Sequence, residues 1–286
     1  MKRIYIILCC SIISIYQVSA QQTLRRFLQP ATVVNNIPYG NNPSAGHYAQ
    51  SGDAKIYYEV YGKGEPFVLL HGGIFGSTIE MAMFIDSLSK YYQVIAISTR
   101  GHGKSENGKE PLTLEQRSND VIAVIKQVTK EKVTVLGFSD GGYTTYQLAS
   151  KYPNQVKKII VIGAGILYPG LRNFHFSVEQ AIKMDTAYWQ QQFSLMPEPK
   201  RLGDVFQQIE NCYSKLTVSN ELLGSIKCPT LLIAGDRDEG NTVENVLKAS
   251  IMIPNHQLAI IPNAGHVVFL DNFLAVWNCI VPFLKN

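Results

Sequence analysis

A serine between two glycines is the residue of this chain that is best placed to do chemistry. It lies in the run Gly137-Phe138-Ser139-Asp140-Gly141, after a short apolar, β-branched segment and before a segment patterned like a helix. This pattern predicts a nucleophile elbow, a sharp strand-to-helix turn that holds the serine in an exposed and strained conformation. The glycines fit because a side chain at either place would crowd the turn. An ordinary surface turn can have the same pattern, so the prediction requires a base, an acid and an oxyanion hole elsewhere in the chain.

A base and an acid are available at the ends of two later predicted strands. His266 follows one of these strands, and both Asp236 and Asp238 follow the other. Because open α/β sheets gather their sites at the carboxyl ends of the strands, we expect these side chains to lie near Ser139. His266 is expected to act as the base, while one aspartate orients it and the other serves the turn. The order serine, aspartate, histidine along the chain is the order that such a sheet requires.

The run His71-Gly72-Gly73-Ile74 follows another predicted strand. A backbone N–H at this place can form an oxyanion hole together with the N–H of Asp140, the residue after the serine. We expect Gly73 to be the donor, with Ile74 as the alternative. Without the elbow, the same four residues would indicate no more than a turn.

Predicted strands and helices alternate along most of the chain, which favours a mostly parallel sheet with helices on both faces. The predicted strands cover residues 54–61, typical of an antiparallel edge strand, and 67–70, 94–97, 133–137, 158–162, 230–234 and 257–261. The predicted helices cover residues 78–90, 113–128, 142–152, 242–250 and 267–283.

The alternation breaks between residues 165 and 224, where no clear strand is visible and aromatic residues are frequent. We interpret residues 165–224 as a helical cap inserted into a core domain formed by residues 54–164 and 225–286. The aromatic side chains of the cap are expected to pack with one another and partly to roof the site. Residues 21–53 are rich in Gln, Asn, Pro and Gly, and we expect them to be an extended leader or linker.

The first twenty residues have the form of a secretory signal peptide. Lys2 and Arg3 precede an apolar stretch, and a small-residue cleavage site ends at Ala20, before Gln21. An uncleaved anchor is the alternative, although the apolar stretch is short for a membrane span. The chain is therefore expected to be exported, either to a periplasm or to the medium. The absence of an Asn-x-Ser/Thr acceptor favours a bacterial protein.

Composition limits the partners that the chain can have. With 46% hydrophobic and 17% charged residues, it is typical of a soluble globular protein. Loss of Lys2 and Arg3 with the signal peptide lowers the net charge from +4 to +2, and no basic cluster indicates binding to nucleic acid or to a membrane surface. The remaining cysteines are too widely spaced for a metal site and allow at most one disulfide. They are Cys212, Cys228 and Cys279.

Nucleotide binding is not expected either. Gly103-Lys104-Ser105 resembles the end of a phosphate-binding loop, but Ser98 stands where that loop requires its first glycine. No Gly-x-Gly-x-x-Gly run opens a helix. The predicted chemistry at Ser139 needs no metal and no organic cofactor.

In its motifs the chain resembles the α/β-hydrolase superfamily, in the branch with a helical cap over the site. The correspondence runs from about residue 54 to the C-terminus and rests on five motifs in register. They are His71-Gly72-Gly73, Arg100-Gly101-His102-Gly103-Lys104-Ser105, Gly137-Phe138-Ser139-Asp140-Gly141-Gly142, Gly235-x-x-Asp238 and Gly265-His266. The resemblance implies the α/β-hydrolase fold, a chiefly structural loop after Arg100, and Asp238 as the acid, since in similar proteins the acid usually lies three residues after that glycine. The Ser-Asp-Gly-Gly form of the elbow is similar to that of valacyclovir-hydrolase-like and related bacterial hydrolases.

Asp140 departs from that resemblance, because many relatives carry methionine or another neutral residue there. Its carboxylate either caps the following helix or faces the pocket and favours a cationic group, such as the α-amine of an amino-acid ester. Further substrate contacts are expected from Ile74, Phe138 and the cap residue Trp189.

Together these features predict an exported serine hydrolase that cleaves a small ester or amide through the triad Ser139, Asp238 and His266 and an acyl-enzyme. A carbon–carbon bond hydrolase or a cofactor-free haloperoxidase would use the same triad on another substrate. From a different class, a non-catalytic ligand-binding member of the fold is a further alternative. The identity of the substrate and the oligomeric state stay open.

Overall fold

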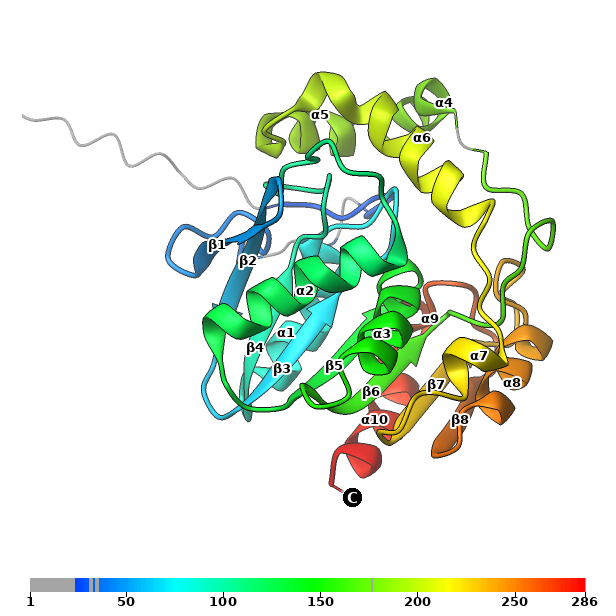
Figure 1. Cartoon of the computed structure of the whole chain (residues 1–286). Coiled ribbons are helices and arrows are strands. Elements are labelled where there is room, and N and C mark those ends of the chain that lie inside the picture. The colour runs from blue at the N-terminus through cyan, green and yellow to red at the C-terminus, as the bar shows by residue number, and fades with distance from the viewer. Residues whose placement is uncertain (1–23, 31–32, 34–35, 176, 286) are drawn as a thin grey trace, which may run out of the picture.

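The protein is built on one eight-stranded sheet (Figure 1), in a computed structural model that describes residues 24–30, 33, 36–175 and 177–285. From one edge to the other, the strands are β1 (Gly46–Ser51), β2 (Ala54–Tyr61), β4 (Tyr92–Ile97), β3 (Glu65–Leu70), β5 (Val133–Phe138), β6 (Val156–Ile162), β7 (Thr230–Gly235) and β8 (His256–Ile261). From β3 to β8 all pairings are parallel, while β2 runs antiparallel to both β1 and β4. Every residue of β5 and β7 is buried, as expected for strands covered on both faces. The predicted mostly parallel sheet is confirmed.

The N-terminal part of the sheet differs from the prediction. Gly46–Ser51, expected to belong to the leader, forms β1 and pairs with β2 along its whole length. Consequently β2 is the second strand and not the edge strand. The pattern of β1 is weak because only Ala49 and Ser51 are buried, which is common for an edge strand with one face in solvent. Leu24 and Tyr39, from the same expected leader, are also buried.

Helices cover both faces of the sheet, and the sheet separates two hydrophobic cores. On one face lie α2 (Leu114–Val128), α3 (Asp140–Lys151) and α8 (Val243–Met252). On the other lie η1 (Thr78–Met81), α1 (Ala82–Leu88), α9 (Val268–Asp271) and α10 (Phe273–Lys285). Alternate residues of β3 enter the two cores, with Val68 in the first and Phe67 in the second. The helix predicted over residues 267–283 is split at Asn272, which ends α9.

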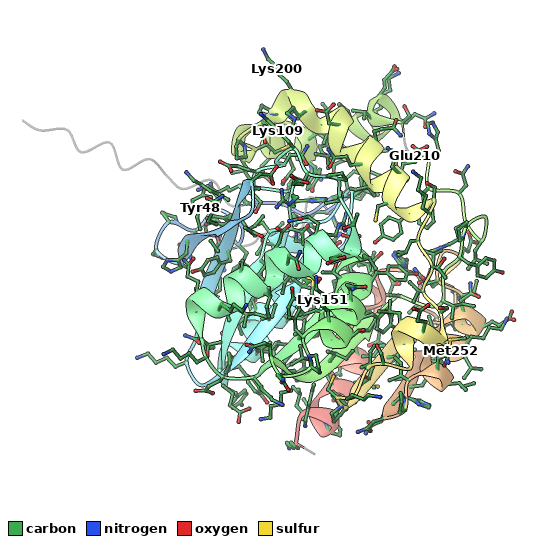
Figure 2. The ribbon with its side chains drawn as sticks, viewed as in Figure 1. Tyr48, Lys109, Lys151, Lys200, Glu210 and Met252 are labelled. Carbon is green, nitrogen blue, oxygen red and sulfur yellow. The ribbon has the colours of Figure 1, made fainter. Side chains whose placement is uncertain are left out.

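Between β6 and β7 the chain leaves the sheet and forms a group of helices, here called the cap. Its segments are α4 (Val178–Met184), α5 (Thr186–Leu195), η2 (Pro199–Arg201), α6 (Leu202–Tyr213) and α7 (Asn220–Leu223). A bridge between Leu167 and Val218 joins the outgoing and returning chains. The helices α5 and α6 lie above one end of the sheet (Figure 1), and Lys200 projects outward from the cap (Figure 2).

The predicted signal peptide, residues 1–20, lies outside the described residues. Within the described part of the chain, no helix combines the length and the apolar character needed to span a bilayer. Cys212, Cys228 and Cys279 carry free thiols.

Candidate active site

The turn between β5 and α3 holds Ser139 in a conformation that side chains rarely adopt. Its φ is +50° and its ψ is −111°. A Cβ at Gly137 would come within 2.2 Å of the carbonyl oxygen of Gly141, and a Cβ at Gly141 within 2.5 Å of that of Leu70. Both glycines are therefore required sterically, and strain of this kind is typical of functional turns.

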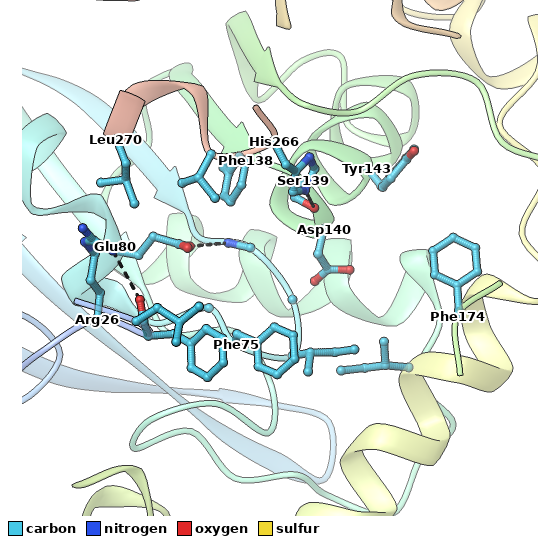
Figure 3. A pocket seen from close by; sticks show the side chains of 18 of the residues that line it. Arg26, Phe75, Glu80, Phe138, Ser139, Asp140, Tyr143, Phe174, His266 and Leu270 are labelled. Carbon is cyan, nitrogen blue, oxygen red and sulfur yellow. Dashed lines mark hydrogen bonds between the residues drawn. The ribbon is translucent and has the colours of Figure 1, made fainter. Parts of the chain in front are cut away.

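His266 lies between Ser139 and Asp238 in one hydrogen-bonded series. Its Nε2 is 2.9 Å from the Oγ of Ser139, a hydrogen bond drawn as a dashed line in Figure 3, and its Nδ1 is 2.7 Å from Oδ2 of Asp238. Because a carboxylate only accepts, it selects the tautomer with the proton on Nδ1 and leaves Nε2 to accept from the serine hydroxyl. The arrangement can therefore move the proton of Ser139 to His266.

The turn after β7 separates the roles of its two aspartates. Asp238 is 3% exposed, and its Oδ1 accepts the backbone N–H groups of Gly240 and Asn241 at 2.9 and 2.8 Å. These bonds fix the carboxylate while its other oxygen faces His266. Asp236 is exposed and accepts the N–H of Ala264 at 3.1 Å. Asp238 thus lies in the series with Ser139, and Asp236 holds the turn.

The loop after β3 brings the two predicted oxyanion donors together. A Cβ at Gly73 would lie 3.0 Å from the Cβ of Asp140, so a residue without a side chain lets the loop come this close to the start of α3 without displacing Asp140. Ile74, the next residue, has φ +53°, which is strained for a β-branched side chain. Strained residues therefore stand on both sides of the candidate oxyanion hole, at Ile74 and at Ser139.

Two side chains, the buried His71 and the partly exposed Glu80, hold this loop in place. The Nε2 of His71 accepts the N–H of Thr99 at 3.0 Å, and its Nδ1 lies 2.6 Å from the carbonyl oxygen of Gly72. Burial lowers the pKa of His71 to about 4, so the ring is neutral and donates from Nδ1. On the other side, the N–H of Gly72 donates to Oε2 of Glu80 at 3.0 Å (Figure 3). Burial raises the pKa of Glu80 to about 7.

The side chain of Asp140 is already paired. Its carboxylate forms an ion pair with Arg117 of α2 and accepts a hydrogen bond from the hydroxyl of Tyr213 at the end of α6. Arg117 and Asp140 are 2% and 3% exposed. The carboxylate thus neither caps α3 nor stands unpaired before a cationic substrate, and it ties the elbow both to the core and to the cap.

A cavity of about 680 Å³ opens over the serine. Its walls come from the elbow, the loop that follows β3 and carries Gly73 (here called the oxyanion loop), the chain around His266, the cap and the N-terminal segment. Ser139, Asp140, Phe138 and Ile74 all line it. Figure 3 shows the labelled side chains around this space.

The prediction for Trp189 was wrong. Its ring is 2% exposed, and its Nε1 donates to the carbonyl oxygen of Ala181 at 2.9 Å inside the cap. The cap instead contributes Phe174, Ile209 and Tyr213 to the cavity wall. A large aromatic side chain is as suited to a small core as to a binding wall, so its type alone could not decide between them.

Comparison with known proteins identifies the family. The sequence profile described as alpha/beta hydrolase fold matches residues 65–211, slightly more than half of the chain. The chain belongs to the α/β-hydrolase superfamily. The enzyme is 27% identical to Serine hydrolase BPHL of Mus musculus over 241 residues, which cover 77% of this chain and 81% of that protein.

Two further relatives extend the comparison. This α/β hydrolase is 25% identical over 263 residues to 2-hydroxy-6-oxo-6-(2'-aminophenyl)hexa-2,4-dienoic acid hydrolase of Metapseudomonas resinovorans, covering 84% of this chain and 90% of that one. The solved structure of a meta-cleavage product hydrolase from Pseudomonas fluorescens superposes with a TM-score of 0.71 at 18% identity. That match covers 85% of this chain and 99% of the other, and it shows a shared fold.

Several residues of this hydrolase's cavity were not expected from its sequence. Arg172, at the start of the cap, donates to the carbonyl oxygen of Gly240 and to the hydroxyl of Tyr143, both at 2.7 Å. Tyr143 in turn donates to Oδ1 of Asn241 at 2.7 Å, so the cap is tied to the turn that carries Asp238. Tyr143 lies one helical turn after Ser139, and helix periodicity could have indicated it. No comparable signal pointed to Arg172.

Proposed function

We propose that this enzyme is a serine hydrolase that cleaves a small ester or amide through an acyl-enzyme. The observation that carries the proposal is the position of His266, within hydrogen-bond distance of both Ser139 Oγ and Asp238 Oδ2. A serine hydroxyl is a weak nucleophile until a base takes its proton, and this arrangement supplies the base together with its orienting acid.

In the first half of the reaction, the Oγ of Ser139 attacks the acyl carbon while its proton passes to Nε2 of His266. Asp238 keeps the ring oriented and stabilises the imidazolium that forms. The N–H groups of Gly73 and Asp140 stabilise the oxyanion of the tetrahedral intermediate. His266 then gives the proton to the leaving alkoxide or amine, the bond to that group breaks, and Ser139 is left acylated.

In the second half, a water molecule replaces the leaving group. His266 takes a proton from the water as its oxygen attacks the acyl carbon, and the oxyanion hole again stabilises the negative charge. Collapse of the intermediate breaks the bond to Ser139 Oγ, which recovers its proton from His266. The acid product leaves, and the enzyme returns to its starting state.

A fluorophosphonate probe tests the proposal directly, because it reacts only with an activated serine. We expect one label, on Ser139, as located by peptide mass spectrometry. Ser139→Ala should abolish labelling and lower kcat on a 4-nitrophenyl ester by a factor on the order of 10⁵. An unlabelled wild-type protein, or ester cleavage that survives in Ser139→Ala, would contradict the proposal. The first of these results would favour a non-catalytic binder.

Hydrolysis of a carbon–carbon bond is the second candidate. It is favoured by the likeness to the dienoic acid hydrolase of Metapseudomonas resinovorans. A panel that sets 4-nitrophenyl esters, aminoacyl esters, lactones and peptides beside a 2-hydroxy-6-oxo-dienoate separates the two candidates. The ester proposal fails if kcat/KM for the dienoate exceeds that for every ester and amide of the panel by more than tenfold.

Export is part of the same proposal and rests on the sequence of residues 1–20. Cell fractionation and N-terminal sequencing of the protein expressed in a bacterium test it. We expect the protein outside the cytoplasm with Gln21 as its first residue. A cytoplasmic protein that begins at Met1 would contradict export without affecting the proposed chemistry.

A further inference from the structure

The N-terminal segment Leu24–Leu28, here called the strap, is fastened to the cap. The guanidinium of Arg25 forms an ion pair with Oδ2 of Asp185 at 3.0 Å, and the N–H of Leu28 donates to the same oxygen at 2.8 Å. The N–H of Arg25 also donates to Oε1 of Gln191 at 3.0 Å. The side chain of Asp185 is only 6% exposed, so the strap is held by a buried carboxylate.

The strap also packs on the oxyanion loop. The ring of Phe27 stacks on that of Phe75, with centroids 4.4 Å apart and planes 10° from parallel, and meets the edge of Tyr188 at 5.4 Å. The hydroxyl of Tyr188 donates to the carbonyl oxygen of Phe75 at 3.0 Å. Phe27 therefore lies between the cap and the loop that carries Gly73, although more than forty residues separate it from that loop along the chain.

Three strap residues line the cavity of Ser139. Arg26, Phe27 and Leu28 form part of its wall, and His266 and Ser139 form another part. Figure 3 shows Arg26 and Glu80 on one side of this space, across from Ser139 and Asp140. A substrate over the serine is thus enclosed by the sheet edge, the cap and the strap.

The guanidinium of Arg26 has little compensation for its charge. Within the described part of the chain it forms no ion pair, and its hydrogen bond is to the carbonyl oxygen of Phe27 at 3.3 Å. Burial lowers the pKa of Arg26, while the nearby Glu80 opposes that effect. Glu80 already accepts the N–H of Gly72 and, with its raised pKa, is partly protonated at neutral pH. A partly buried cation without a full counter-charge favours the binding of an anion.

The other charges of the cavity have partners of their own. Asp140 is paired with Arg117, and Oδ2 of Asp271 accepts the N–H of Gly265 at 2.7 Å. Within the described residues Arg172, like Arg26, has no ion pair, and its Nε has no hydrogen-bond partner, but its two terminal nitrogens are already held by the carbonyl oxygen of Gly240 and the hydroxyl of Tyr143. Arg26 is therefore the cavity-lining charge on which a ligand can act with the least rearrangement.

We propose that the strap is a wall of the substrate site and that Arg26 binds a carboxylate of the substrate, so that the enzyme prefers esters or amides of dicarboxylic acids. This inference rests on the proposed function for the reaction at Ser139, but it concerns binding and can be tested without turnover. In this proposal Arg26 determines specificity, because it contacts the remote end of the substrate and takes no part in the proton transfers.

Calorimetric titration of the Ser139→Ala protein provides the test. Succinate, glutarate and adipate are compared with their neutral diamides, so that charge changes while length does not. We expect at least one dicarboxylate to bind better than its diamide. Adding Arg26→Gln should weaken that dicarboxylate about tenfold and leave the diamide unchanged, and Arg26→Lys should recover part of the loss.

A matched variant controls for net charge. Arg201 lies on the cap and pairs with Glu198 and Asp204 outside the cavity, so Arg201→Gln removes the same charge and should leave binding of the dicarboxylate unchanged. Phe27→Ala, which opens the wall without altering charge, should weaken the dicarboxylate and the diamide together. The proposal is overturned if no dicarboxylate binds, or if Arg26→Gln has the same effect as Arg201→Gln. Failure of the proposed reaction would be recognised separately, by the absence of a fluorophosphonate label on Ser139.

Discussion

The cavity has two sides that are built by different means. On the sheet side, Ser139, Asp238 and His266 follow β5, β7 and β8, and buried parallel strands set their positions. On the cover side, the strap and the cap are joined by side-chain contacts between distant segments, such as Arg25 with Asp185 and Phe27 with Phe75. This difference in construction assigns proton transfer to the sheet side and substrate recognition to the cover side. Proton transfer needs atoms fixed to within a fraction of an ångström, which strand ends provide, whereas recognition can be changed on the cover without disturbing them.

The largest effect is expected on the sheet side, where one turn carries two aspartates. Asp238→Asn should lower kcat/KM on a 4-nitrophenyl ester about 10⁴-fold, because an amide no longer selects the productive tautomer of His266. Asp236→Asn changes the same kind of group in the same turn, and we expect less than a threefold loss. Steady-state kinetics of both variants, with circular dichroism to verify folding, make the comparison. Equal losses would show that the turn matters as a whole and that Asp238 has no special role.

The second effect concerns Asp140, where the two sides meet. Arg117→Met leaves the carboxylate buried without its cation, and we expect the free energy of unfolding to fall by about 3–5 kcal/mol. The double variant Arg117→Met/Asp140→Asn removes both charges and should recover more than half of that loss. Tyr213→Phe removes only the hydrogen bond from the cap and should cost about 1–2 kcal/mol. Urea unfolding measures all three.

Additive losses in the double variant would contradict a coupled pair at this junction. A loss in Tyr213→Phe as large as that in Arg117→Met would mean that the cap, and not the core, holds Asp140. The first result would mean that Arg117 and Asp140 do not stabilise the fold as a pair, and the second that Asp140 belongs with the cover side of the cavity.

The same division explains what the sequence could predict. The elbow, the acid turn and the loop with Gly73 are local: each needs particular residues over three to six positions, and steric demands such as those at Gly137 leave a visible pattern. The alternation of strands and helices then placed them at one edge of the sheet.

The contacts within the cover could not be predicted in this way, although the helical character of residues 165–224 could. Phe27 meets Phe75 and Arg25 meets Asp185 only after the chain has folded, and no local pattern records such contacts. On the sheet side the partner of Asp140 could not be predicted either, because nothing in the sequence of residues 113–128 indicates that Arg117 faces Asp140. Trp189 was misplaced for the same reason, since core packing and wall lining use the same side chains.

An effect about as small as that of Tyr213→Phe is expected at Glu80, which accepts a hydrogen bond from Gly72 and lies near the charge of Arg26. Its pKa is about 7 in the folded protein, against an ordinary value of about 4.5. Between these values the unfolded chain ionises while the folded protein keeps its proton, so the stabilising contribution is complete below pH 4.5 and is lost as the pH rises to 7. Glu80→Gln cannot ionise, yet its amide oxygen can still accept from Gly72. From pH 4.5 to pH 8 its free energy of unfolding should therefore rise relative to wild type by about 2 kcal/mol, allowing for water in the cavity.

Urea unfolding at several pH values measures this difference, with the exposed Glu131→Gln as the control. A difference that stays constant with pH would place Glu80 in an environment like that of any surface carboxylate, and Arg26 would then have a full counter-charge beside it.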